Sequence, residues 1–128
     1  RHRRVRAVAG TLGWQLHKRL HRGPRDVDFY GWRLRCHPDS NSASNVIYFT
    51  EMYDVDEMGF MRAYLRPGDG FLDVGANIGT YSLLARSLVG AEGQVVAFEP
   101  HPVAAARWRA LRRRDHSPAG RGWPFPAR

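Results

Sequence analysis

The sequence predicts an α/β fold in which a partial parallel sheet is preceded by a β-hairpin and a basic N-terminal helix. Two strand–helix units indicate the sheet. An apolar run at residues 71–74 leads through a glycine turn into residues with helical apolar spacing, and a second run at 94–98 leads through Pro100 and Pro102 into another helical pattern. Strand, helix, strand and helix in this order are typical of a right-handed parallel βαβ unit.

A basic amphipathic helical arm is predicted for residues 1–26. Apolar residues recur there every three or four positions with arginines between them, and Gly23-Pro24 ends the pattern. Such a helix could pack on its own domain, contact an anionic membrane surface or bind a partner. Because the apolar face of an amphipathic helix usually packs against a protein core, packing or simple solvation is the favoured interpretation. The apolar positions are Val5, Val8, Leu12, Leu16 and Leu20.

Residues 27–66 are predicted to form the β-hairpin and a capped helix. Residues 29–35 alternate as a strand does, and residues 46–49 are a compact apolar run. The stretch between them, 37–45, has the composition of a loop, so we expect an irregular connection there.

The helix that follows is predicted from its cap. Asp54 as N-cap and Glu57 three residues later match a capping box, and apolar residues follow at helical spacing. Pro67 and Gly68 then end the helix before the first strand of the parallel sheet.

The formal net charge of +8 belongs to the ends of the chain. Residues 1–25 carry eight Lys or Arg and no acid, and residues 107–128 carry seven Arg and one Asp. Residues 26–106, which contain the glycine turn, carry five Arg against eleven acids. The basic character therefore lies away from the expected site, and no specific nucleic-acid partner is expected.

The single cysteine, Cys36, excludes an internal disulfide framework and favours a reduced, cytoplasmic setting. No stretch approaches the roughly 18 consecutive apolar residues of a membrane span. Cys36 and His37 lack the spacing of a metal site, so no metal is expected. His37 and His101 each precede a proline and are more typical of solvated turns than of catalytic bases.

The glycine turn at residues 73–82, Asp-Val-Gly-Ala-Asn-Ile-Gly-Thr-Tyr-Ser, is the predicted cofactor site. A strand, a tight turn and a helix N-terminus in succession are expected to present unpaired backbone N–H groups to a ligand. A Walker loop would need a Gly-Lys-Ser/Thr end, and no lysine lies near. A dinucleotide fingerprint would need Gly-x-Gly-x-x-Gly, and the glycines at 75 and 79 match it poorly.

Two carboxylates bracket this turn and favour S-adenosylmethionine. Asp73 would repel a pyrophosphate but attract an ammonium group, which this cofactor carries together with a sulfonium. Gly75 and Gly79 would let the backbone approach the ligand, and Asn77 tolerates a positive φ. Glu99, after the next strand, could accept hydrogen bonds from both ribose hydroxyls. Taken singly, Asp73 could instead cap the following helix, and Glu99 could be a surface acid.

Four segments also carry a resemblance: 53–58 (Tyr-Asp-Val-Asp-Glu-Met), 65–69 (Leu-Arg-Pro-Gly-Asp), 71–82 and 96–102 (Val-Ala-Phe-Glu-Pro-His-Pro). They resemble the FkbM family of S-adenosylmethionine-dependent methyltransferases over about residues 27–111. The resemblance implies a class I methyltransferase with a Rossmann-like sheet, which transfers a methyl group to a hydroxyl of a sugar, glycolipid or polyketide-type metabolite. By position it implies cofactor contacts from Asp73, Gly75, Ala76, Asn77, Gly79, Thr80 and Glu99.

On this interpretation, residues 67–113 are the first half of the S-adenosylmethionine-binding Rossmann-like domain, and 114–128 are a disordered tail. The pattern departs from the family after Leu111, so the sequence indicates a truncated or frameshifted fragment, and no catalytic residue is assigned. The acceptor, a small molecule or a glycan, and the oligomeric state stay open. The alternative is a non-catalytic remnant or binding module whose basic ends contact an anionic partner.

Overall fold

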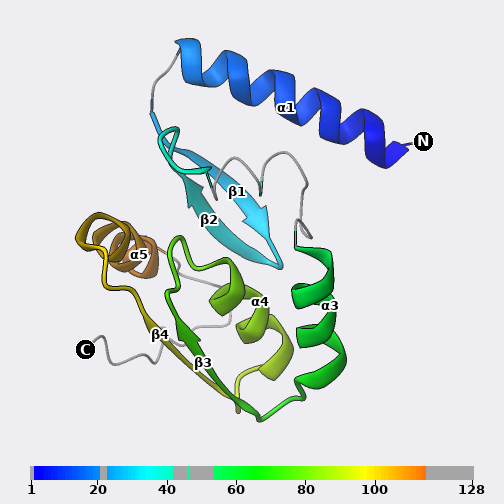
Figure 1. Cartoon of the computed structure of the whole chain (residues 1–128), viewed down its shortest axis with the longest axis vertical. Helices are drawn as coiled ribbons and strands as arrows, with labels where there is room; N and C mark the ends of the chain where they lie inside the picture. Colours follow the sequence, from blue (N-terminus) through cyan, green and yellow to red (C-terminus); the bar gives the residue numbers. More distant parts are fainter. Residues whose placement is uncertain (1, 21–22, 42–45, 47–53, 115–128) are drawn as a thin grey trace.

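The chain has a mixed α/β structure with one antiparallel and one parallel two-stranded sheet (Figure 1). The computed structural model describes residues 2–20, 23–41, 46 and 54–114. Within these residues the elements are α1 (His2–Leu20), β1 (Arg25–Phe29), β2 (Trp32–Cys36), α3 (Val55–Tyr64), β3 (Gly70–Val74), α4 (Thr80–Val89), β4 (Gln94–Phe98) and α5 (Pro102–Arg114).

The parallel unit β3–α4–β4 forms as predicted. Asp73 lies opposite Ala97 and Val74 opposite Phe98, so both strands end at the same edge of the sheet. Helix α4 packs between this sheet and α3, and it buries Leu83 and Leu84 almost completely. The predicted helix after β4 is also present, and Pro102 is its first residue.

One cluster of buried side chains joins the hairpin, three helices and the parallel sheet. An aromatic residue of α1 and one of β1 meet methionine, leucine and valine side chains of the later elements in this cluster. The largest side chains with less than 2% exposure include Trp14, Phe29, Leu34, Met58, Leu83, Leu84, Val89 and Val95.

The hairpin turns earlier than predicted. β1 and β2 are connected by Tyr30 and Gly31 alone, and the φ angles of these two residues are 50° and 79°. Positive φ at both central residues is typical of the type I′ turn that matches the twist of a two-residue hairpin. The prediction of a connection at 37–45 is therefore wrong, because the run 29–35 contains the turn itself.

Two further boundaries predicted from the sequence differ from those in the structure. Helix α1 ends at Leu20 and β1 begins at Arg25, so the last residues of the segment predicted as a helical arm are extended. Of the run 46–49 only Val46 lies within the described residues, and its backbone is helical there rather than extended. The predicted disordered tail lies outside the described residues, apart from its first residue, Arg114, which ends α5.

The predicted capping box of α3 does not form. Asp54 is the N-cap residue, but its side chain makes no capping hydrogen bond. Its carboxylate instead accepts a hydrogen bond from the hydroxyl of Tyr81 on α4. Hydrogen bonds with Glu57 and then with Tyr81 lower the pKa of Asp54. The side chain that the local pattern assigns to a cap therefore links two helices.

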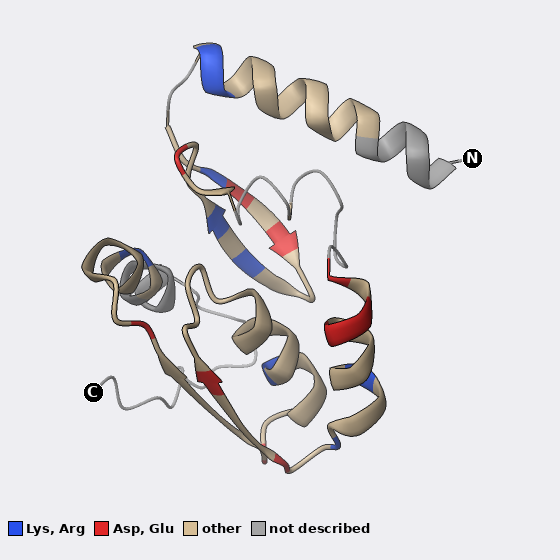
Figure 2. Ribbon diagram, in the orientation of Figure 1, with Lys and Arg blue, Asp and Glu red and all other residues tan. Residues whose placement is uncertain are grey.

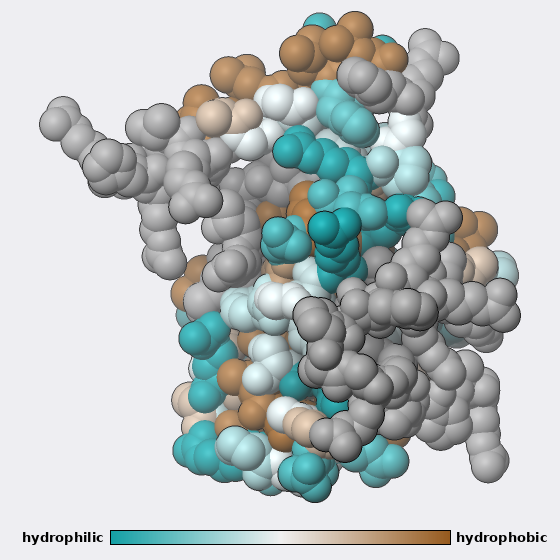
Figure 3. All heavy atoms as spheres, turned by 180° about the vertical axis from the view of Figure 1, so that it is seen from behind, coloured by the Kyte–Doolittle hydropathy of each residue, from teal (hydrophilic) through white to brown (hydrophobic). Residues whose placement is uncertain are grey.

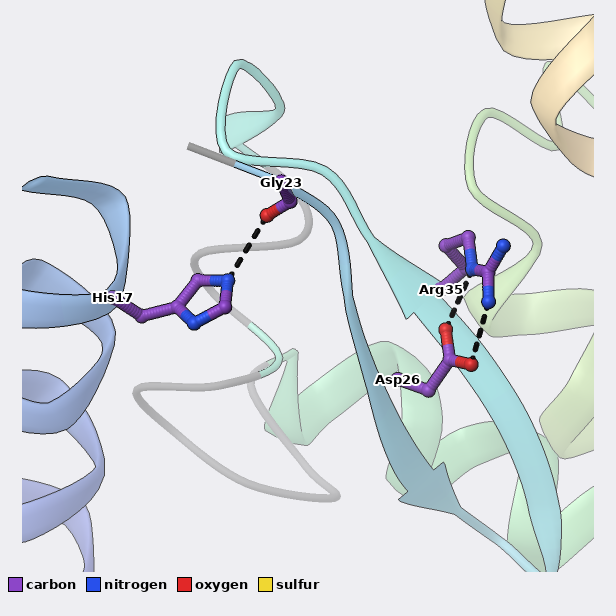
Figure 4. A network of polar contacts seen from close by, with 4 residues as sticks. All are labelled: His17, Gly23, Asp26 and Arg35. Carbon is purple, nitrogen blue, oxygen red and sulfur yellow. Dashed lines mark hydrogen bonds and ion pairs between the residues drawn. The ribbon is translucent and has the colours of Figure 1, made fainter. Parts of the chain in front are cut away.

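Helix α1 is attached to the rest of the molecule near its C-terminal end (Figure 4). His17 donates a hydrogen bond from Nε2 to the carbonyl oxygen of Gly23 at 3.0 Å, and its ring stacks on Trp14 with centroids 5.4 Å apart. In the hairpin, Arg35 forms a bidentate ion pair with Asp26, both contacts at 2.7 Å. None of the helices in the described part of the chain combines the length and apolarity needed to cross a membrane.

Candidate cofactor site

The glycine turn between β3 and α4 adopts a conformation that few residue types allow. Gly75, Asn77 and Gly79 have φ angles of 89°, 51° and 88°. Such angles strain most side chains, whereas glycine adopts them freely and asparagine tolerates them. The positive φ that the sequence analysis allowed for Asn77 is thus confirmed, and the turn has a defined left-handed shape.

The backbone N–H groups of this turn are largely paired within the protein. Gly75 and Ala76 both donate to the carbonyl oxygen of Phe98, at 2.8 and 2.9 Å, and Gly79 donates to Ala76 at 2.7 Å. Asn77 donates to Glu99. The expectation of unpaired N–H groups is wrong for these four residues, because the turn folds back onto the end of β4. A turn whose donors are already used is a poor phosphate cradle.

Glu99 is fixed in place by hydrogen bonds to both of its oxygens. Oε2 accepts from the backbone N–H of Asn77 at 2.6 Å, and Oε1 accepts from that of His101 at 2.7 Å. A carboxylate offers about four lone-pair sites, so each oxygen can accept a further hydrogen bond. Glu99 therefore connects the glycine turn to the end of β4 and keeps acceptor capacity for a ligand.

Asp73 lies beneath the first turn of α4 and is only 8% exposed. Its Oδ2 accepts a hydrogen bond from the hydroxyl of Ser82 at 2.5 Å. Burial raises the pKa of Asp73, and the negative charge of Glu99 raises it further, while the hydrogen bonds from Ser82 lower it. Asp73 is thus hydrogen-bonded to the first turn of α4 through Ser82, and it lies close enough to Glu99 for the negative charge of Glu99 to raise its pKa.

The last glycine of the turn is covered by a tryptophan that the sequence analysis did not assign to the site. A Cβ atom placed on Gly79 would lie 2.0 Å from Cζ3 of Trp108, so the indole of α5 lies directly against the turn. Thr80, the next residue, is the first of α4 and is 4% exposed. The available signal was the position of Trp108 in the helix that follows Glu99, but single tryptophans are far more often packing residues.

We assign no catalytic role to His37 or His101. Nδ1 of His101 accepts a hydrogen bond from the backbone N–H of Ala104 at 3.5 Å, which places His101 at the start of α5 as a turn residue. Burial, followed by the charge of Arg107, lowers the pKa of His37. Arg107 itself forms an ion pair with Asp39 at 2.7 Å and connects α5 to the segment after β2.

No metal centre is found within the described part of the chain, where His, Cys, Asp and Glu form no group of three or more with suitable geometry. Cys36 is fully buried, and burial raises the pKa of its thiol to about 12. A thiol with such a pKa is protonated at neutral pH and is a poor nucleophile or ligand.

Comparison of the chain with models of known protein families finds no match, and comparison with curated proteins finds none either. The geometry brings together Asp73, Gly75, Ala76, Asn77, Gly79 and Glu99 at the carboxyl edge of a parallel sheet. Ligands of open α/β sheets bind outside this edge. Two neighbouring carboxylates there produce a negative potential that suits a cation.

Proposed function

We propose that the chain binds S-adenosylmethionine at the glycine turn and serves as the cofactor-binding part of a methyltransferase. The single observation that carries the proposal is the position of Glu99, which follows β4 and is fixed by the N–H groups of Asn77 and His101. Its remaining lone pairs are the acceptors that we assign to the ribose hydroxyls. The resemblance to the FkbM family implies that Glu99 is one of the cofactor contacts.

The charge of the site supports a cationic ligand over a dinucleotide. The effect of Glu99 on the pKa of Asp73 indicates that the two carboxylates repel each other. An ammonium or sulfonium group between them would relieve this repulsion, whereas a pyrophosphate would add to it. Backbone N–H groups usually stabilise a bound phosphate, but those of Gly75, Ala76 and Gly79 are already paired within the protein.

The residues of the chain would then act by positioning. Glu99 would orient the ribose, the turn from Gly75 to Gly79 would bring the backbone close to the ligand, and Trp108 would limit access from the side of α5. When bound, S-adenosylmethionine would supply a methyl group for the hydroxyl of a sugar, glycolipid or polyketide-type metabolite.

Isothermal titration calorimetry with paired variants tests the proposal. Glu99→Gln removes the charge but keeps one carbonyl acceptor, and we expect it to weaken S-adenosylmethionine binding by about tenfold. Glu92→Gln is the matched control, because Glu92 is exposed in the turn before β4, at the opposite end of the sheet. We expect the control to bind S-adenosylmethionine as the wild type does. We expect NAD to bind neither the wild type nor the control.

Circular dichroism spectra of the variants establish that their fold is retained. Equal affinities of Glu99→Gln and the wild type would contradict the assignment of Glu99. Absence of binding to the wild type would contradict the proposed function as a whole.

A further inference from the structure

The outward side of α1 carries a row of exposed apolar side chains, which we call the leucine ridge. Its members recur every four residues, and at 3.6 residues per turn such positions lie along one side of a helix. Figure 3 shows hydrophobic atoms along the outer edge of this helix, at the top of the view. The members, with their exposed fractions, are Val8 (59%), Leu12 (66%), Leu16 (57%) and Leu20 (67%).

Helix α1 contacts the molecule through its other side. Trp14 is fully buried and belongs to the core cluster, and on a helix it points roughly opposite to the middle of the leucine ridge. His17, stacked on Trp14, donates its hydrogen bond to Gly23. Of the two parts of the favoured interpretation, packing on the chain's own domain or simple solvation, the four ridge residues agree with solvation and not with packing. The ridge stays exposed while the helix is attached.

The charged residues of α1 and of the segment up to Arg25 are all basic in the sequence. Residues 1–25 contain eight Lys or Arg and no acid. In the last turn, Arg19 is exposed, and Lys18 lies over the ring of Trp14 with Nζ 5.9 Å from its centroid. Figure 2 shows blue at this end of α1 and no red along the described part of the helix. Pairing of two ridges in a dimer would bring these like charges together, which is unfavourable. The complementary partner is an anionic one that also accepts leucine side chains.

An anionic lipid surface meets both requirements. The acyl region accommodates the leucines, and the headgroups neutralise the arginines and lysines, as for other basic amphipathic helices that lie in the membrane interface. A nucleic acid would neutralise the charge but leave the ridge in water. We propose that α1 docks the protein on anionic membranes, in the plane of the headgroups. This inference does not depend on the proposed function.

Co-sedimentation of the full chain with vesicles tests the proposal. We expect binding to mixed phosphatidylcholine–phosphatidylserine vesicles and little binding to phosphatidylcholine alone. Leu12→Gln combined with Leu16→Gln changes two exposed residues, so the fold should be retained, and we expect the affinity for the mixed vesicles to fall by about tenfold or more. The matched control is Val55→Gln combined with Phe60→Gln on α3, whose residues are 62% and 65% exposed.

The control should bind as the wild type does, and added salt should weaken binding of both. The proposal is overturned if the wild type does not sediment with the mixed vesicles, or if the ridge variant binds them as well as the control does. It is also overturned if sedimentation equilibrium shows a wild-type dimer that the ridge variant abolishes, since the ridge would then be a contact between copies of the chain.

Discussion

Asp73 is a buried carboxyl whose contribution to stability opposes its proposed contribution to binding. Its folded-state pKa is raised, mainly by burial, so the ionised form costs free energy in the folded protein. The contribution of this group to stability is greatest at low pH and is lost as the pH rises through the raised pKa. The charged form of Asp73 is therefore less favourable in the folded protein than in the unfolded chain.

The first prediction concerns Asp73→Asn. Asparagine keeps an oxygen for the hydroxyl of Ser82 and removes the buried charge, so we expect equal or higher stability in urea unfolding at neutral pH. The advantage over the wild type should shrink as the pH falls through the raised pKa and vanish below the ordinary pKa of an aspartate. S-adenosylmethionine affinity, by contrast, should fall by about tenfold. A large loss of stability at neutral pH would show that the charge of Asp73 serves the fold.

The second prediction concerns Gly79. Alanine there would combine a left-handed φ with overlap of its Cβ and the ring of Trp108, so we expect Gly79→Ala to lower the free energy of unfolding by about 2 kcal/mol or more. Gly59→Ala on α3 is the control. Apart from its chain neighbours and the backbone of its own helix, no atom lies within 4 Å of the added Cβ, and we expect a gain of up to about 1 kcal/mol. Similar unfolding midpoints in urea for both variants would contradict the placement of Trp108.

Among the elements, the contact between α3 and α4 depends on a side chain that the local sequence assigns elsewhere. The hydroxyl of Tyr81 donates to Asp54, 27 residues earlier in the chain. We predict that Tyr81→Phe lowers the free energy of unfolding by about 1 kcal/mol, because the hydrogen bond is lost while the ring still packs. Combining it with Asp54→Ala, which removes the acceptor, should cost less than the sum of the two separate changes, and additive losses in urea unfolding would contradict the pairing.

The same elements show which parts of the fold the sequence predicts. Apolar patterns bounded by glycine and proline predict β3, α4, β4 and α5. The register of β3 with β4 confirms the prediction that these two strands are parallel. The hairpin was misplaced because a Tyr-Gly pair is a weaker turn signal than the polar stretch at 37–45. The capping box failed because a competing donor comes from a distant part of the chain, which no local window contains.

For the site, the sequence predicts which residues meet but not how they are bonded. Asp73, Asn77 and Glu99 converge because parallel strands end at one edge. The turn pairs with Phe98 and is covered by Trp108 only through tertiary packing. The expectation of unpaired N–H groups was therefore wrong, and Trp108 was missed.

Across the whole molecule, the two proposed interactions depend on protein charges of opposite sign. The basic residues around α1 would contact an anionic lipid surface, while two carboxylates at the glycine turn would bind a cationic cofactor. The parallel sheet is covered by α4 on one face, but Leu72 and Val74 on the other are 60% and 77% exposed. Parallel sheets are usually covered on both faces, so the described part of the chain leaves this sheet incompletely packed.

The location of the cofactor is tested most directly by following backbone amide resonances of the full chain in nuclear magnetic resonance spectra as S-adenosylmethionine is added. We predict that the largest shifts occur at Asn77 and His101, whose N–H groups are hydrogen-bonded to Glu99, and at the other residues of the glycine turn. The resonances of α1 should stay unchanged. Saturable shifts confined to another region, or no shifts at all, would contradict the assignment of the glycine turn as a cofactor site.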